Sequence, residues 1–301
     1  MARKTDAETV TVKIGRYKVV TYSYGTGSEV LLLLNGGPGL PCDYLRDPLI
    51  AMVGKGYRVV TYDQLGCGQS DRPKEESLWT IGRYVEEVDT VRRSLGLGRI
   101  HLLGHSWGGW LAIDYAIKYQ KNLQSLILSN TCGDMPHLIA ELNRHRNALG
   151  PETVAMMQRC EAENNLEHPA YKAAITLLNY RHVLRLDHWP KPVTASLDDW
   201  NQDVYGTMQG PNEFLYTGNL KDWNRIGQMT RIKTPTLIMC GQHDELTPAC
   251  SMRMHHALPR SEITVFPNSS HMPMWEEPAA YLERLTRFLA KNGPVSNSNR
   301  A

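Results

Sequence analysis

Short apolar runs alternate with amphipathic runs of helical length along most of this sequence. Residues 29–34, a glutamate followed by Val-Leu-Leu-Leu-Leu, end at glycines, which is typical of a strand buried on both faces. Strands that alternate with helices predict βαβ units, so we expect an α/β fold around a mostly parallel sheet. Further strands are expected at residues 58–62, 99–103, 123–129, 236–240 and 262–266, and helices at residues 81–95, 109–119, 249–257 and 278–290.

Two segments depart from this alternation. Residues 9–14 and 17–24 are rich in β-branched and aromatic residues and are joined at a glycine, so they predict an antiparallel hairpin. The stretch after residue 131 is polar and has helical but no strand signals. We therefore expect a catalytic core of residues 1–131 and 224–292, a helical cap of residues 132–223 and a flexible tail of residues 293–301.

Charge and composition exclude several classes of protein. The 33 basic and 31 acidic residues are interspersed and leave a net charge of +2, so no nucleic-acid partner is expected. No apolar run approaches the ~20 residues of a membrane span. The first residues lead into no apolar stretch typical of a signal peptide, and the six cysteines form no CxxC pair. We expect a cytoplasmic protein with reduced thiols, several of them buried.

The strongest local signal is Gly-His-Ser-Trp-Gly at residues 104–108. It follows an expected strand and precedes an expected helix, the context that a nucleophile elbow requires. Glycines permit the tight turn, because a Cβ beside the serine would clash. The motif therefore predicts a serine hydrolase of the α/β-hydrolase fold, with Ser106 as nucleophile.

A serine hydroxyl needs a base, and the base needs an orienting carboxylate. In this fold the three residues follow in the order Ser, Asp or Glu, His. Two later strands each run into a suitable loop, and carboxyl ends of parallel strands are where such folds place their sites. We expect His271 to be the general base and Asp244 to orient it, with Glu245 as the second candidate for the acid.

The oxyanion hole requires two backbone N–H donors. One should come from the residue after the nucleophile, Trp107, and the other from the glycine-rich loop after residues 29–34. We assign this second donor to Gly37 and expect its neighbour Gly36 to lie against the substrate, because glycine permits close approach of the backbone. The sequence has neither the ligand pattern of a catalytic zinc site nor a dinucleotide fingerprint, so no metal or cofactor is expected.

Several of these motifs resemble those of the proline iminopeptidases, which are α/β-hydrolase aminopeptidases. The resemblance spans nearly the whole chain and is closest to the branch of tricorn-protease-interacting aminopeptidases. The matching segments are residues 35–39, 63–70, 104–109, 210–214, 217–218, 221–223, 244–248 and 271–276. The resemblance implies cleavage of an N-terminal residue, often proline, from short peptides, amides or arylamides through an acyl-enzyme.

The resemblance also implies that two glutamates hold the free α-ammonium group of the substrate. By position these are Glu213 and Glu245. Charge-assisted hydrogen bonds from an ammonium to paired carboxylates would read the amine close to the scissile carbonyl. We further expect a peptide or amino-acid amide as substrate, no membrane partner, and a monomer or small homo-oligomer.

One position departs from the family pattern. Asn35 stands where the family usually has a histidine before Gly-Gly-Pro-Gly. The oxyanion donors are backbone groups, so catalysis should survive, and the asparagine can still hydrogen-bond within the loop. An amino-acid amidase, or an esterase or lactonase using the same triad, remains an alternative. The sequence leaves open which N-terminal residue is preferred.

Cap aromatics could shape the pocket for the N-terminal side chain, although plain packing is the commoner use of such residues. The candidates are Tyr205, Phe214, Tyr216 and Trp223.

Overall fold

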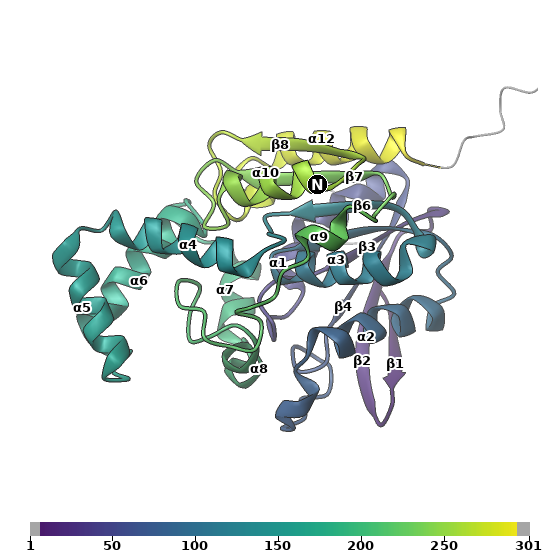
Figure 1. Ribbon diagram of the computed structural model, residues 1–301. Helices are drawn as coiled ribbons and strands as arrows, with labels where there is room; N and C mark the ends of the chain where they lie inside the picture. Colours follow the sequence, from purple (N-terminus) through teal and green to yellow (C-terminus); the bar gives the residue numbers. More distant parts are fainter. Residues whose placement is uncertain (1–6, 294–301) are drawn as a thin grey trace, which may run out of the picture.

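The computed structural model describes residues 7–293 and is built around one eight-stranded sheet (Figure 1). The strand order is β1-β2-β4-β3-β5-β6-β7-β8. Strand β2 pairs antiparallel with β1 on one side and with β4 on the other, and the remaining neighbours are parallel. The strands are β1 Glu8–Ile14, β2 Tyr17–Tyr24, β3 Glu29–Leu34, β4 Tyr57–Asp63, β5 Ile100–His105, β6 Leu123–Ser129, β7 Thr236–Gly241 and β8 Ser261–Phe266.

Helices cover both faces of this sheet. On one face α2, α3, α9 and α10 contact one another in turn, and on the other α1, α11 and α12 do so. Their bounds are α1 Asp43–Leu49, α2 Ile81–Ser94, α3 Trp107–Tyr119, α9 Ile226–Met229, α10 Pro248–Ala257, α11 Pro273–Glu276 and α12 Pro278–Lys291. Short 3-10 helices lie at Ile50–Lys55, Glu76–Leu78 and Gln120–Asn122. Because both faces are covered, the central strands β3 and β5 are almost wholly buried, as the apolar run at β3 predicts.

Between β6 and α9 the chain leaves the sheet and forms five helices. These are α4 Met135–Asn147, α5 Pro151–Ala162, α6 Pro169–His182, α7 Lys191–Asp198 and α8 Gln202–Met208. Figure 1 shows α4, α5 and α6 projecting to one side of the sheet, with α7 and α8 below. The expected helical character of this stretch is confirmed, since its only β-structure within the described residues is isolated bridges.

The expected hairpin, the parallel sheet and every expected strand are present, with bounds that differ by one or two residues. The helix expected from residue 109 begins earlier, at Trp107, directly after the candidate nucleophile. Three short helices, α1, α9 and α11, were not predicted, because segments of four to seven residues show too little periodicity. Apart from Gly293, the expected flexible tail lies outside the described residues.

No helix in residues 7–293 combines the length and the apolar character needed to cross a membrane.

Candidate active site

Ser106 lies at the sharp turn between β5 and α3. Its backbone has φ 55° and ψ −123°, a region that non-glycine residues rarely occupy. The turn is held in place by the Ser106 N–H, which donates to the Ser129 carbonyl at 3.1 Å, and by the Thr131 hydroxyl, which donates to the Ser106 carbonyl at 2.8 Å. The strained conformation predicted from the motif is therefore present, and the strand and helix on either side of it support the serine.

The glycines around Ser106 are required by close packing. A Cβ at Gly104 would lie 2.1 Å from the Gly108 carbonyl oxygen, and a Cβ at Gly108 would lie 2.1 Å from the Leu34 carbonyl oxygen. Both clashes involve backbone atoms, so no side-chain movement could relieve them. The elbow thus packs directly onto the end of β3, where the glycine-rich loop begins.

His271 and Asp244 meet as the chain order predicts. The His271 Nδ1 lies 2.8 Å from the Asp244 Oδ1, and both side chains are buried. Asp244 accepts two further hydrogen bonds, one from the Leu246 N–H at 2.9 Å and one from the Asn130 amide at 2.7 Å. With its oxygens occupied in this way, Asp244 can fix the histidine ring and stabilise the imidazolium that forms during catalysis.

Asn130 supports this pair and was not identified from the sequence. It follows β6 directly and has a positive φ of 50°. Its amide nitrogen donates to Asp244 and also to the Ser270 carbonyl at 3.1 Å. It therefore links the loop after β7, which carries Asp244 (the acid loop), to the loop after β8, which carries His271 (the base loop). The available signal was its place at the carboxyl end of a central strand.

The surroundings of His271 favour its protonated form. Burial acts to lower the pKa of His271, but the charge and hydrogen bond of Asp244, followed by the charge of Glu213, outweigh it and raise the pKa above its ordinary value. Glu245 lies on the other side of the ring, with its Oε1 3.6 Å from the His271 Nε2. Nδ1 therefore faces Asp244, which identifies Asp244 rather than Glu245 as the better candidate for the orienting acid.

A chain of hydrogen bonds runs from the glycine-rich loop to the base loop. The Gly36 N–H donates to the Tyr44 hydroxyl at 2.5 Å, and this hydroxyl lies 2.8 Å from the His105 Nδ1. The His105 Nε2 is 2.8 Å from the His271 carbonyl oxygen, so it donates there, and Nδ1 accepts from the tyrosine. Burial, with the nearby His271 adding to it, lowers the pKa of His105 well below its ordinary value and keeps the ring neutral, as this arrangement requires.

These hydrogen bonds distinguish Gly36 from Gly37 in the candidate oxyanion loop. The Gly36 N–H is already donated to Tyr44, so it is not free to bind an oxyanion. A Cβ on Gly36 would lie 2.7 Å from the Ser106 Cβ, which shows how closely this loop approaches the nucleophile. Gly37, at φ 50°, lines the pocket together with Ser106 and remains the candidate donor beside Trp107 at the start of α3.

Asn35 holds this loop from within the protein. It is buried, its amide nitrogen donates to the Leu40 carbonyl, and its side-chain oxygen accepts from the Gln64 amide at 3.3 Å. Gln64 in turn accepts from the Trp107 indole at 2.9 Å. The expected hydrogen bonding of Asn35 within the loop is confirmed, and its buried side chain connects the loop to Gln64.

Glu213 and Glu245 form an acidic pair beside the triad. Glu245 is fully buried, and neither of its carboxylate oxygens has a hydrogen-bond partner among the described residues. Burial, followed by the charges of Glu213 and Asp244, raises the pKa of Glu245 well above its ordinary value. Burial also raises the pKa of Glu213, although His271 and a 2.8 Å hydrogen bond from Gln209 act against it. A cation placed here would relieve both penalties.

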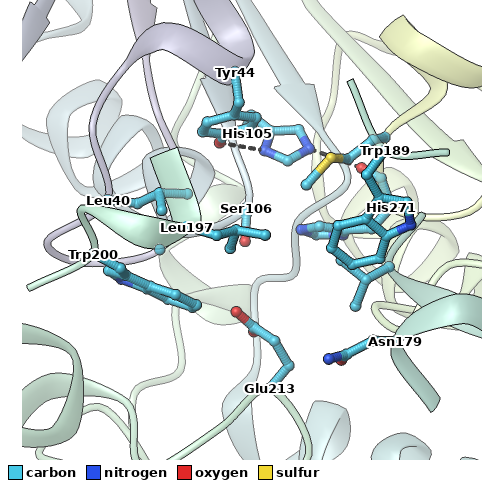
Figure 2. A pocket seen from close by; sticks show the side chains of 13 residues that line it. Leu40, Tyr44, His105, Ser106, Asn179, Trp189, Leu197, Trp200, Glu213 and His271 are labelled. Carbon is cyan, nitrogen blue, oxygen red and sulfur yellow. Dashed lines mark hydrogen bonds between the residues drawn. The ribbon is translucent and has the colours of Figure 1, made fainter. Parts of the chain in front are cut away.

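A pocket of about 490 Å³, which includes its mouth, opens above Ser106 (Figure 2). Figure 2 shows Glu213 between Trp200 and Asn179, with Ser106 beyond it and His271 to the side. Most of the wall is apolar. The lining residues are Gly37, Leu40, Tyr44, His105, Ser106, Asn179, Val183, Trp189, Leu197, Trp200, Glu213, His271 and Met272.

The four aromatic candidates do not themselves line this pocket. Tyr216 and Trp223 pack against Trp110, each with 6.3 Å between ring centroids, and Phe214 is buried. Tyr205 packs against Trp200, with 4.1 Å between ring centroids and the rings tilted by 54°. The wall uses Trp189 and Trp200, which no motif singled out, because nothing in a single sequence distinguishes a pocket tryptophan from a packed one.

Within residues 7–293, no group of three or more His, Cys, Asp or Glu side chains is arranged to hold a metal ion.

Comparison with known proteins agrees with this geometry. Residues 29–278 match the family model of the alpha/beta hydrolase fold. A proline iminopeptidase of Saccharolobus solfataricus is 40% identical over 261 residues, covering 86% of this chain and 84% of that protein. One from Thermoplasma volcanium is 36% identical and covers 87% and 89%.

Two solved structures are similar along nearly the full length. The crystal structure of VinJ has a TM-score of 0.91 and 33% identity, covering 95% of this chain and 99% of that one. The structure of a proline iminopeptidase from Mycobacterium smegmatis has a TM-score of 0.88 and 31% identity, covering 95% and 98%. The fold, the sequence identity and the coverage together show that this chain belongs to the proline iminopeptidase family of α/β-hydrolase serine hydrolases.

Proposed function

We propose that this protein is a serine aminopeptidase that removes the N-terminal residue, proline foremost, from short peptides and amino-acid amides. The observation that carries the proposal is Glu245, a buried carboxylate beside Glu213 and the triad. Within residues 7–293 it accepts no hydrogen bond, and its ion-pair contact there is the His271 Nε2 at 3.6 Å. Ionising a carboxylate that is buried without hydrogen bonds is costly, and a cationic ligand bound beside it would offset that cost. The α-ammonium group of a peptide is a cation of suitable size.

The proposed mechanism uses the side chains that line one pocket, among them Ser106, Glu213 and His271. An ammonium bound at Glu213 and Glu245 would bring the adjacent carbonyl carbon to Ser106. His271 takes the hydroxyl proton through Nε2 as the serine oxygen attacks, and the N–H groups of Gly37 and Trp107 stabilise the oxyanion. The imidazolium then protonates the departing amine, which leaves an ester between the amino acid and the serine. Water, deprotonated by the same histidine, hydrolyses this ester and restores the enzyme.

The helices inserted between β6 and α9 serve this chemistry. We infer that residues 132–223 are a cap on a core of residues 1–131 and 224–292, because α6 and α7 contribute Asn179, Val183 and Leu197 to the pocket wall. The loop after α8 contributes Glu213. The amine-binding side of the site is thus built jointly by the insertion and the core.

The likeness to tricorn-interacting aminopeptidases supports a narrower proposal. The motifs of that branch at residues 210–214 and 244–248 are the segments that carry Glu213 and Glu245. The narrower proposal is that oligopeptides released by a larger protease are the natural substrates. All six cysteines are buried and unpaired, which supports a cytoplasmic site of action.

A panel of aminoacyl arylamides tests the proposal, with the wild type and Ser106→Ala measured together. Prolyl arylamide should be hydrolysed and its N-acetylated form should not, and Ser106→Ala should be inactive on both. Glu245→Gln should lose on the order of 100-fold in kcat/KM for prolyl arylamide, about 2.7 kcal/mol of transition-state binding. An esterase or lactonase for uncharged substrates would keep its activity in Glu213→Ala. Equal turnover of free and acetylated substrates would contradict amine recognition.

A further inference from the structure

The site described so far accounts for the N-terminal residue but not for the group that leaves. His271 must protonate the departing amine, so the leaving group lies on the His271 side of Ser106. The end of α6 borders this side, since the His271 N–H donates to the His182 carbonyl at 3.2 Å. Asn179 and Val183, four residues apart and both lining the pocket, belong to that same end of α6.

Apart from His271 itself, the wall on this side is apolar and has no cationic side chain. Val183, Met272 and Trp189 line it, and among all the described lining residues there is no lysine or arginine. The acidic groups close by are Glu213 in the wall and the buried Glu245 next to His271. Asn179 is the one uncharged polar side chain that α6 adds.

The apolar wall continues outward along α6. The Trp189 ring packs against Tyr180 with 5.4 Å between centroids, and Tyr180 is 48% exposed. Leu177, three residues before it on the same helix, is 43% exposed. A large apolar group that extends past Trp189 would therefore meet further apolar surface.

From this arrangement we propose that the leaving-group subsite selects uncharged, apolar leaving groups, and that the enzyme prefers N-terminal prolyl amides and longer apolar peptides to dipeptides with a free carboxylate. The inference rests on the proposed aminopeptidase function and adds the chemistry of the leaving group. In a dipeptide the α-carboxylate sits two bonds from the departing nitrogen, so it would lose its hydration against Val183 and Trp189. An amide, or a carboxylate one residue further out, avoids this cost.

Three substrates that differ only at the leaving side test the proposal. These are prolyl-leucinamide, prolyl-leucine and prolyl-leucyl-leucine, with proline release measured at one pH. We expect kcat/KM for the amide to exceed that for the free dipeptide by about tenfold or more, the effect of roughly 1.4 kcal/mol, with the tripeptide close to the amide. Equal rates, or a preference for the dipeptide, would overturn the inference. If prolyl arylamide and all three peptides resist hydrolysis, the proposed function fails instead.

A charge placed in the wall provides the complementary test. Val183 caps the C-terminus of α6, where a cation is tolerated, so Val183→Lys should bring the dipeptide rate toward that of the amide. Val183→Met is the matched control, since it has similar length without charge, and it should keep the wild-type preference. An unchanged ratio in a folded Val183→Lys protein that hydrolyses prolyl arylamide would count against the subsite. If that variant does not fold, the comparison of substrates on the wild type still decides.

Discussion

Among single residues, Tyr44 and His105 have an importance that their motif positions do not indicate. His105 is the variable position of the Gly-His-Ser-Trp-Gly motif, yet it receives a hydrogen bond from Tyr44 and donates one to the His271 backbone. Tyr44 also accepts the Gly36 N–H. Two buried side chains therefore link the glycine-rich loop, which carries the candidate oxyanion donor, to the loop that carries His271.

Tyr44→Phe should lower kcat more than it raises KM. The variant leaves the Gly36 N–H and the His105 Nδ1 unpaired in a buried site, each at a cost of about 1–3 kcal/mol. The loops can shift to relieve this cost, which moves the oxyanion donor away from Ser106. Steady-state kinetics on prolyl arylamide should show kcat reduced on the order of tenfold or more. Tyr119→Phe, which removes only an exposed hydrogen bond to Glu86, is the control, and an equal effect there would rule out the positioning role.

The sequence was sufficient to identify the residues of the proposed catalytic triad. Ser106, Asp244 and His271 each follow a strand, and the chain order of their types leaves few alternatives. Asn130 and Tyr44 were missed because they act through other residues. An asparagine or tyrosine with this role has no spacing rule, and its partners are far away in the sequence, as with the 114 positions between Asn130 and Asp244.

At the scale of elements, the end of α6 joins the inserted helices to both catalytic loops. The His182 carbonyl accepts the N–H of Glu245 and the N–H of His271, each at 3.2 Å. Its ring lies 2.9 Å from the His243 carbonyl oxygen through Nδ1 and stacks on His145 of α4 at 3.8 Å. One helix terminus thus fixes the acid loop, the base loop and the neighbouring helix.

His182→Ala should therefore affect catalysis as well as stability. The variant keeps the backbone carbonyl but removes the hydrogen bond to His243 and the stacking with His145. We expect the thermal midpoint to fall and kcat for prolyl arylamide to drop severalfold, since His243 precedes Asp244. His188→Ala, at an exposed histidine beyond the same helix, should change neither property. If His182→Ala lowers the thermal midpoint but leaves kcat unchanged, the ring is only structural.

Elements with a clear hydrophobic pattern were predictable, and helices too short to show helical periodicity were not. The strand at Glu29–Leu34 and the helix at Pro278–Lys291 follow from hydrophobic pattern alone. The helix α1, which places Tyr44, has seven residues with a proline inside and therefore little periodicity. The way α6 meets the catalytic loops depends on tertiary packing, which hydrophobic periodicity does not encode.

For the molecule as a whole, the acidic pair of Glu213 and Glu245, which we propose binds the substrate, lowers the stability of the free protein. Burial and the nearby carboxylates raise the pKa of Glu245, so the folded protein holds a proton there that the unfolded chain releases as the pH rises. The free energy of unfolding therefore falls as the pH rises above the ordinary carboxyl pKa. The fall ends once the pH exceeds the raised pKa of Glu245 in the folded protein. In the complex, the bound ammonium group of the substrate would supply the missing cation and offset this loss of stability.

Glu245→Gln should accordingly be more stable than the wild type at pH 8 and lose that advantage near pH 4. At low pH both states of the wild type carry a neutral carboxyl, which glutamine resembles, so the gain disappears. Each unit of raised pKa corresponds to about 1.4 kcal/mol, and each kcal/mol moves the midpoint by about 2–4 °C. Thermal melts of both proteins across this pH range measure the difference. Glu283→Gln, at an exposed carboxylate, should show no such pH-dependent gain. A Glu245→Gln protein that melts below the wild type at pH 8 would mean that this carboxylate is already paired in the folded protein, and the argument for an ammonium site would lose its main support.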